Sequence, residues 1–398
     1  MLAAGLGPDM KFLFVKQSLG WPRAAGHDVH GYYMMRALSA AGHGVALATV
    51  NVPADAALKG AGLEATYVLD KVGRSDHPTT ETRFQERFRR YYGIEPTHIA
   101  AVRDLARDVH ADATVAVGLE VLPYLASVTR ALRVWYAADE WLWHHLSQIR
   151  LGNPRSWHHV RDGLIKGLYE RAYHRVVDVT WVVTEVDRRA MELVGGMRDV
   201  AVIPNGVDAD FYQPQAAPEI PNSAVFWGRL DFGPNVDALT WFCRDIWPFV
   251  RRRQPDGRLT IIGYEPSPAI RRLAGRDGIE LKANVDDLPS EACRHGVAIL
   301  PFVSGGGIKN KLLEAAALSR AIVCSPVAAR GLQHGPTSPF TVATNRTDWM
   351  EALLRLWAND QLRRERGRSA RQWVIAYHNW PAAATKAVDS LTTHRGQP

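Results

Sequence analysis

The stretch "VAILPFVSGGGIKNKLLEAAALSRAIVCSP", residues 297–326, joins an apolar run, three glycines, two lysines and one glutamate to an alanine-rich segment. The apolar run predicts a buried strand, and the alanine-rich segment predicts a helix. Glycines after a strand let backbone N–H groups approach an oxyanion, because no Cβ intervenes. The helix N-terminus adds partial positive charge at the same place. The stretch therefore indicates a phosphate site at the carboxyl end of a strand.

The charged residues of this stretch extend the interpretation. Lys309 and Lys311 fall at the start of the expected helix, from which they can reach back to a diphosphate. Glu314 lies deeper in the helix, where its carboxylate can accept two ribose hydroxyls. A glycine-rich turn with solvated lysines and a surface glutamate fits the stretch equally well when it is taken alone. Neither a Walker loop nor a G-x-G-x-x-G after the first strand is present.

Bulk properties narrow the class of protein. A chain of 398 residues is too long for one ordinary core and predicts two domains. The three cysteines form no C-x-x-C pair. No apolar run approaches the roughly 20 residues of a membrane span. The N-terminus lacks the basic n-region of a signal peptide. We therefore expect a cytoplasmic protein. The net charge of +7 favours an anionic partner, but no nucleic-acid-binding module accompanies it, so nucleic acid is not expected.

Strand and helix patterns alternate along the whole chain and start afresh near Ser223. Strands are expected at 11–18, 44–50, 113–120, 133–140, 179–185 and 200–208, then at 224–230, 258–264, 278–284, 297–302 and 321–326. Helices are expected between them, among them 29–43, 81–93, 155–175 and a single helix over 235–253. Two such successions predict an α/β protein with two doubly wound domains and a cleft between them.

Four stretches in this order carry a family resemblance: "VIPNGVDADFY", "FWGRLDFGPNVDAL", "IIGYEPSP" and "FVSGGGIKNKLLEAAALSRAIVCSP". With them the chain resembles, over nearly its whole length, the retaining group-1 (family 4-like) glycosyltransferases of the GT-B fold. The resemblance implies two Rossmann-like domains facing a cleft. Residues 1–200 would bind the acceptor, 201–375 would bind the nucleotide sugar, and a C-terminal helix in 376–398 would cross back onto the first domain.

The resemblance also implies an activity. The protein would transfer a hexose-like sugar with retention, without a metal ion or other cofactor, from a UDP-, GDP- or dTDP-sugar to a glycan, lipid-linked or small-molecule acceptor. Such transfer belongs to polysaccharide or glycolipid biosynthesis. Two alternatives stay open: a nucleotide-sugar 2-epimerase of the same fold, and a protein that binds nucleotide sugars without catalysis. A panel of donors would separate all three.

Matched motif by motif, the resemblance assigns roles to individual residues. Gly228 and Arg229 would contact phosphate, Gly263 would lie near the nucleotide, the backbone at Val285 would form the base pocket, and Glu314 would hold the ribose. Further donor-binding residues would be Gly26, Ser304, Gly305, Gly306, Gly307, Ile308, Lys309 and Lys311. The catalytic candidates are Arg229 and Lys311 at the leaving diphosphate, and Asp28 and Asp139 on the acceptor side.

The sequence departs from the family pattern at sugar-handling positions. Gly306 stands where many members carry a glutamate, eight positions before Glu314. Asp139 and Glu140 occupy the region of a sugar-contacting histidine, and the usual Gly-Gly is Ala25-Gly26. The lysine that usually follows the Gly-Arg pair is absent, so Lys309 and Lys311 would supply that charge. These departures leave the identity of the donor sugar open.

Three further patterns in the sequence carry weaker signals. "DAD" at 208–210 imitates a metal-binding D-x-D, but its place after "IPNGV" favours a turn. "HDVH" at 27–30 lacks the additional ligands that a zinc site needs. The basic, aromatic segment "ETRFQERFRRYYG" at 81–93 is compatible with peripheral attachment to an anionic membrane surface at its inner face, and equally with a solvated helix.

Overall fold

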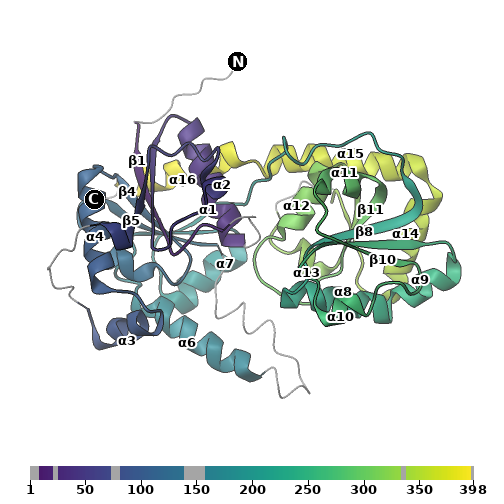
Figure 1. The fold of residues 1–398 in the computed structure, drawn as a ribbon, viewed down its shortest axis with the longest axis horizontal. Helices are drawn as coiled ribbons and strands as arrows, with labels where there is room; N and C mark the ends of the chain where they lie inside the picture. The colour runs from purple at the N-terminus through teal and green to yellow at the C-terminus, as the bar shows by residue number, and fades with distance from the viewer. Residues whose placement is uncertain (1–8, 21–25, 73–80, 139–156, 333–337, 396–398) are drawn as a thin grey trace. The chain divides into compact units, whose positions relative to one another are not determined.

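The computed structural model describes residues 9–20, 26–72, 81–138, 157–332 and 338–395. The chain forms two compact units: unit 1 comprises residues 1–204 with 380–398, and unit 2 comprises residues 205–379 (Figure 1). Each unit contains one parallel sheet with helices packed on it. The chain thus passes between the units at 204/205 and 379/380, where the sequence had suggested 200/201 and 375/376.

The sheet of unit 1 has the strand order β3-β2-β1-β4-β5-β6-β7, with all neighbours parallel. Its strands are β1 Lys11–Lys16, β2 Gly44–Thr49, β3 Ala65–Val68, β4 Ala113–Val117, β5 Leu132–Ala138, β6 Val179–Val182 and β7 Val200–Val202. Its α-helices are α1 Gly26–Ala40, α2 Asp55–Leu58, α3 Arg83–Tyr91, α4 Pro96–Asp108, α6 His158–Ala172, α7 Glu185–Ala190 and α16 Trp380–Arg395, and a π-helical turn, η4, covers Met191–Gly195.

Side chains of β1 show how this sheet is covered on both faces. Leu13 and Val15 belong to one apolar cluster, and Phe12 and Phe14 belong to a second cluster that includes residues of α1 and α16. Successive strand residues point to opposite faces, so a strand buried on both faces reads as a continuous apolar run. The C-terminal helix α16 is therefore part of the core of unit 1.

The sheet of unit 2 repeats the same topology, in the order β10-β9-β8-β11-β12-β13, again with parallel neighbours. Its strands are β8 Ile220–Arg229, β9 Arg258–Tyr264, β10 Ile279–Ala283, β11 His295–Leu300, β12 Ala321–Cys324 and β13 Thr341–Val342. Its helices are α8 Gly233–Asp245, α9 Trp247–Arg253, α10 Pro268–Arg271, α11 Leu288–Cys293, α12 Asn310–Ala317, α13 Pro326–Ala329, α14 Arg346–Ala358 and α15 Asp360–Tyr377.

The predicted pair of doubly wound domains is confirmed, with local corrections. The single helix expected over 235–253 is wrong: α8 ends at Asp245 and α9 starts at Trp247. Pro248 lacks an N–H group and its ring clashes with the carbonyl four residues earlier, so a continuous helix cannot pass through it. The short edge strands β3 and β13 were not predicted, because their few half-exposed residues give little periodic signal.

The cysteines and the apolar helices bear on the expectations from composition. Cys243, Cys293 and Cys324 are buried, and none of them forms a disulfide. Among the helices in the described part of the chain, none combines the length and the apolar character that a membrane span requires.

Candidate functional site

The switch point of the unit 2 sheet gathers the residues expected to bind the donor. Strands β8 and β11 lie side by side, and the chain order runs outward from them in opposite directions. Ligands of open parallel sheets bind at the carboxyl ends of the strands at this point, where the connecting loops diverge. Here β8 ends at Arg229, and β11 is followed by residues 301–309, which lead into α12.

The loop before α12 has the backbone that the glycine run implied. Gly305 and Gly307 have φ values of 109° and 60°, in the left-handed region that favours glycine. Helix α12 begins at Asn310 without a side-chain cap on its first N–H groups. Uncapped N–H groups and the positive end of the helix dipole favour an anion at this position. The arrangement is suited to phosphate.

Lys311 extends along the end of β8. A Cβ on Gly228 would lie 2.8 Å from Lys311 Nζ, and Gly228 has a φ of 144°. Glycine at this position therefore leaves room for the lysine side chain. Burial lowers the pKa of Lys311, and the nearby Glu314 carboxylate acts in the opposite direction. An ammonium group that burial disfavours gains more from an anionic ligand than a solvated one does.

Glu314 is positioned by an aromatic side chain of β8. The indole Nε1 of the buried Trp227 donates a hydrogen bond of 2.7 Å to Glu314 Oε2, and Tyr212 also hydrogen-bonds to this carboxylate. Burial raises the pKa of Glu314, against the opposing effects of Lys311 and the two hydrogen bonds. A carboxylate offers about four acceptor positions, so sites remain for ligand hydroxyls.

Sequence reasoning missed Trp227 and Tyr212. A signal was present for Trp227, which directly precedes the Gly-Arg pair in a buried strand. A buried indole N–H usually finds an acceptor, so a partner near the strand end could have been sought.

The two remaining cations predicted for the phosphates already have protein partners. The Arg229 guanidinium donates to both oxygens of Asp231, at 2.8 and 2.7 Å, and this pairing lowers the pKa of Asp231. Lys309 Nζ donates to the Gly306 carbonyl and lies 5.8 Å from the centre of the Phe302 ring. Each would have to exchange a partner to reach a diphosphate, whereas Lys311 already lies along the strand end.

Gly263 and Val285 lie at the ends of the next two strands. Gly263 pairs in register with Gly228, and a Cβ on Gly263 would overlap the Gly228 carbonyl oxygen. Val285 is partly buried and follows β10, next to Asn284, whose N–H donates to the Gly263 carbonyl at 2.9 Å. The ends of β8, β9 and β10 are thereby joined beneath the loops.

Gly263→Ala should therefore disrupt the strand ends. Its Cβ collides with backbone, which cannot move as a flexible side chain can, so we expect a loss of stability of about 1–3 kcal/mol together with weaker nucleotide binding. Urea unfolding and calorimetry with UDP would measure both. Gly233→Ala is the matched control, because a Cβ there meets nothing within 4 Å. Equal, small effects in both variants would contradict the role given to Gly263.

Two candidates fall in unit 1 rather than at the unit 2 switch point: Gly26, expected to bind the donor, and Asp28, expected on the acceptor side. Gly26 begins α1, and Asp28 lies in its first turn, beside the carboxyl end of β1. Asp28 is buried and accepts a hydrogen bond of 2.6 Å from Lys16 Nζ, which also donates to the Ser18 carbonyl at 3.0 Å. Asp139 and Glu140 lie outside the described residues. The contacts of Asp28 give it a structural task, because it neutralises a buried lysine.

Asp28→Asn is accordingly expected to destabilise unit 1 as well as to lower turnover. Removing one partner of a buried ion pair leaves an uncompensated charge, which costs about 3–5 kcal/mol. The exposed fractions of the Lys16 and Asp28 side chains are 2% and 10%, so little water reaches the pair. Chemical unfolding of Asp28→Asn, Lys16→Met and the double variant would measure the coupling. If the loss in free energy of unfolding in the double variant equalled the sum of the losses in the two single variants, Lys16 and Asp28 would not be coupled.

The turn at 208–210 is confirmed, because Asp208 Oδ1 accepts hydrogen bonds from the N–H groups of Asp210 and Phe211 at 3.2 and 3.1 Å. Within the part of the chain that the structure describes, no three His, Cys, Asp or Glu side chains gather into a metal-binding group.

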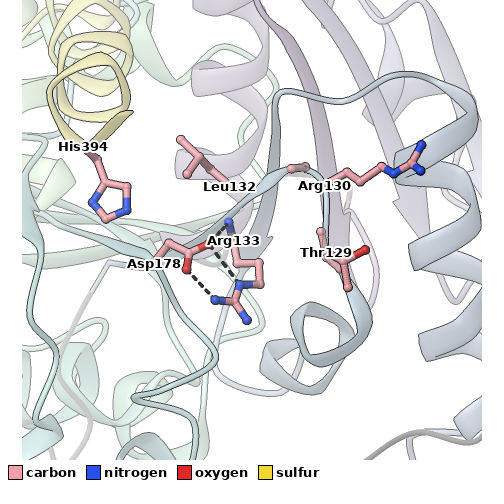
Figure 2. A pocket seen from close by; sticks show the side chains of 8 residues that line it. Thr129, Arg130, Leu132, Arg133, Asp178 and His394 are labelled. Atoms are coloured by element: carbon pink, nitrogen blue, oxygen red, sulfur yellow. Dashed lines mark hydrogen bonds and ion pairs between the residues drawn. The ribbon is translucent and has the colours of Figure 1, made fainter. Parts of the chain in front are cut away.

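A cavity of about 500 Å³ occurs elsewhere in unit 1. Figure 2 shows Arg133 and Asp178 pointing toward one another on its wall, with His394 of α16 nearby. Arg133 and Asp178 lie at the amino-terminal ends of β5 and β6, whereas Asp28 lies at the carboxyl end of β1. Because the strands are parallel, the cavity opens at the opposite edge of the sheet. Arg133 and Asp178 already neutralise each other, so we assign this pair no catalytic role.

Comparison with known proteins agrees with this geometry. Residues 221–359 match the model of the family described as glycosyl transferases group 1. Phosphatidyl-myo-inositol mannosyltransferases of Mycobacterium tuberculosis and Mycobacterium bovis are 28% identical over 255 residues, or 60% of this chain. The matched region spans 64% of the length of these relatives.

Solved structures show the same fold. Sucrose-phosphate synthase from Thermosynechococcus elongatus has a TM-score of 0.69 at 14% identity, covering 96% of this chain and 98% of its own. The Anabaena protein HepE, solved with UDP and glucose, has a TM-score of 0.67 at 14% identity, covering 96% and 100%. The fold is thus of the GT-B type, and the match to the group 1 family model lies within unit 2.

Proposed function

We propose that this chain, with its group 1 match in unit 2 and its GT-B-type fold, is a retaining glycosyltransferase that uses a nucleotide-sugar donor. One observation carries the proposal: the unit 2 switch point brings Lys311 against Gly228 and Glu314 against Trp227, beside an uncapped helix N-terminus. Cationic, anionic and backbone groups are then at hand for a diphosphate and a ribose. This is the set of contacts that a nucleoside diphosphate needs.

In the proposed reaction the bond between the anomeric carbon and the donor phosphate oxygen breaks, and the nucleoside diphosphate leaves with the electron pair. The acceptor oxygen forms the new bond on the same face of the sugar, and its proton passes to the departing phosphate oxygen. Charge develops on the diphosphate as it leaves, so Lys311, Arg229 and the α12 N-terminus stabilise the transition state. These groups supply the positive charge that a divalent cation provides in other transferases.

For the donor we propose a UDP-, GDP- or dTDP-hexose. HepE was solved with UDP and glucose, which supports a nucleotide of this class. Gly306 and its neighbours offer no carboxylate for the sugar hydroxyls within the loop itself. Sugar selection would then depend on residues outside the loop.

For the acceptor we propose a lipid-linked or glycolipid molecule bound through unit 1. The mycobacterial relatives are named for mannosyl transfer involving phosphatidyl-myo-inositol, which supports this class. A lipid-linked acceptor would require a cytoplasmic enzyme to work at the inner face of a membrane.

Incubation with a panel of UDP-, GDP- and dTDP-sugars tests the proposal. A transferase should hydrolyse its true donor slowly without acceptor, and faster transfer should follow when phosphatidylinositol is added. Proton NMR of the glycosylated acceptor would report the anomeric configuration, and retention is expected. Conversion into a C2-epimeric nucleotide sugar would indicate the epimerase, and donor binding without turnover under either condition would indicate a binding protein.

A further inference from the structure

Two neighbouring helices of unit 1, α3 and α6, present outward faces that mix arginine with large apolar side chains. Five of these apolar side chains are more than half exposed: Phe84 61%, Tyr91 72%, Trp157 60%, Leu164 55% and Leu168 54%. Large apolar side chains at this exposure are common singly, but a group on adjoining elements marks an interaction surface. We call these five residues, with Arg83, Arg87 and Arg90, the α3/α6 face.

The exposed residues of α3 share one side of the helix. Arg83, Arg87 and Arg90 follow at intervals of four and three, and Phe84 and Tyr91 are seven apart on the adjoining stripe. The opposite side is buried, where Phe88 packs edge-to-face on Tyr169 with ring centres 4.7 Å apart. The helix is therefore anchored on one side and open on the other.

Helix α6 shows the same division. Trp157 just before it, and Leu164 and Leu168 within it, follow at spacings of seven and four on one side. Gly163, Gly167, Tyr169 and Glu170 are buried. Tyr169 contacts Phe88, and Gln85 Nε2 donates to the Ala172 carbonyl at 3.1 Å, so α3 and α6 pack together by their inner sides (Figure 1). Leu164 and Leu168 are apolar where a solvated helix would carry polar residues.

Arg89 is not part of this face. Its Nε donates to the Glu81 carboxylate at 2.9 Å, its Nη1 donates to the Ile94 carbonyl at 2.9 Å, and its side chain is only 11% exposed. Sequence reasoning on the segment 81–93 placed all its arginines in one group. The structure instead selects Arg83, Arg87 and Arg90, of which Arg90 carries an exposed ion pair with Glu86.

We propose that the α3/α6 face docks on an anionic lipid bilayer. On α3, guanidinium groups adjoin the aromatic side chains, and α6 adds exposed leucines, the composition of helices that lie at the boundary between headgroups and acyl chains. The arginines complement anionic headgroups, the net charge of +7 has the same sign, and the apolar side chains would enter the interface. A nucleic acid would satisfy the arginines but would leave Leu164 and Leu168 in water. The proposal concerns an outer surface of unit 1 and does not depend on the donor site.

Flotation of the full chain with lipid vesicles tests the docking. The parent protein should bind vesicles of phosphatidylcholine and phosphatidylglycerol in equal parts at physiological salt, and should not bind phosphatidylcholine alone. Combined Arg83→Glu, Arg87→Glu and Arg90→Glu should lower the partition coefficient at least about 100-fold, because losing each arginine near an anionic surface costs about fivefold and each new carboxylate is repelled. Combined Leu164→Gln and Leu168→Gln should lower it about tenfold and leave the salt dependence unchanged.

Matched controls come from unit 2. Arg253→Glu, Arg272→Glu and Arg276→Glu reverse the same number of exposed charges, and Ile375→Gln with Val342→Gln remove exposed apolar side chains. Both controls should bind vesicles like the parent. If the arginine control lost as much vesicle binding as the α3/α6 arginine variant, the effect would come from net charge alone and the proposal would be overturned. A parent protein that does not bind anionic vesicles would overturn it as well.

Two other binding partners of the α3/α6 face would give different experimental results. A concentration-dependent dimer in light scattering that is lost in the leucine variant would assign the face to a second copy of the chain. Tight binding of a single-stranded oligonucleotide that is lost in the arginine variant would assign it to nucleic acid. Donor hydrolysis should be unchanged in both face variants, so failure of the docking proposal and failure of the proposed activity would be seen separately.

Discussion

Glu314→Ala is expected to weaken binding of the donor's nucleoside diphosphate by about 30- to 1000-fold. Two hydroxyl hydrogen bonds to a carboxylate contribute about 2–4 kcal/mol with incomplete additivity, at 1.4 kcal/mol per decade. Trp227 and Tyr212 hold the carboxylate in place before the ligand arrives, so little ordering is needed on binding. Isothermal calorimetry with UDP, GDP and dTDP would measure the loss and identify the preferred base.

Two further variants separate the ribose contact from the structural one. Trp227→Phe removes the indole donor to Glu314 and the volume of the five-membered ring but keeps the carboxylate, so we expect a smaller loss than in Glu314→Ala, about tenfold. Glu314→Gln keeps the shape and removes the charge, so its loss should be intermediate. If Glu314→Ala is folded and binds every nucleotide as the parent does, the stretch at 304–314 is a structural turn.

The protonation of Glu314 gives an independent readout. Burial raises the pKa of this carboxyl group above 4.5, and the ionised form is the stronger acceptor for ribose hydroxyls. Nucleotide affinity should therefore be full above this raised pKa and fall as the pH drops through it. The acid loss should begin at a higher pH than an ordinary glutamate would give, and it should vanish in Glu314→Gln.

Lys311→Met is expected to lower kcat by about 100- to 1000-fold while changing the affinity for the free nucleoside diphosphate less than tenfold. Charge on the leaving group grows toward the transition state, and removing one pre-positioned donor of this kind costs about that factor. Methionine fills the space beside Gly228 that the lysine stem occupies, so the strand end should be undisturbed. Turnover with the true donor and calorimetry with UDP, measured side by side, would show the split.

Lys309→Met is the matched control for Lys311→Met. Lys309 precedes the helix and already donates to the Gly306 carbonyl, so its loss should lower kcat no more than about tenfold. Burial lowers the pKa of Lys311 below 10.5, and catalysis needs its ammonium form. The parent's kcat/KM should therefore decline as pH rises through that pKa, and Lys311→Met should lack this limb. If Lys311→Met instead lost affinity for the free nucleoside diphosphate and kept the kcat of the parent, Lys311 would be assigned to ground-state binding.

The sequence by itself determined the architecture and the place of the candidate donor site. Short buried runs alternating with helical patterns predict parallel strands and crossover helices, and this signal depends only on residues near one another in the chain. The glycine run at 305–307 and the helix after it were equally local, because left-handed φ values and a helix start are properties of a few consecutive residues. Such features can be predicted without knowing which other helices and strands pack against them.

Only the tertiary structure decided which side chains meet. Trp227 and Glu314 are 87 residues apart and become partners because β8 and β11 are neighbours in the sheet. The close approach of Gly263 to Gly228 follows from strand register, and the ion pair of Asp28 follows from the packing of α1 on β1. Arg89 differs from Arg90 only through the carboxylate and carbonyl that the folded chain brings to it. The contacts of Trp227 and Gly263 depend on pairing and packing between distant segments, and those of Arg89 on how the chain turns at either end of α3; a periodic pattern encodes neither.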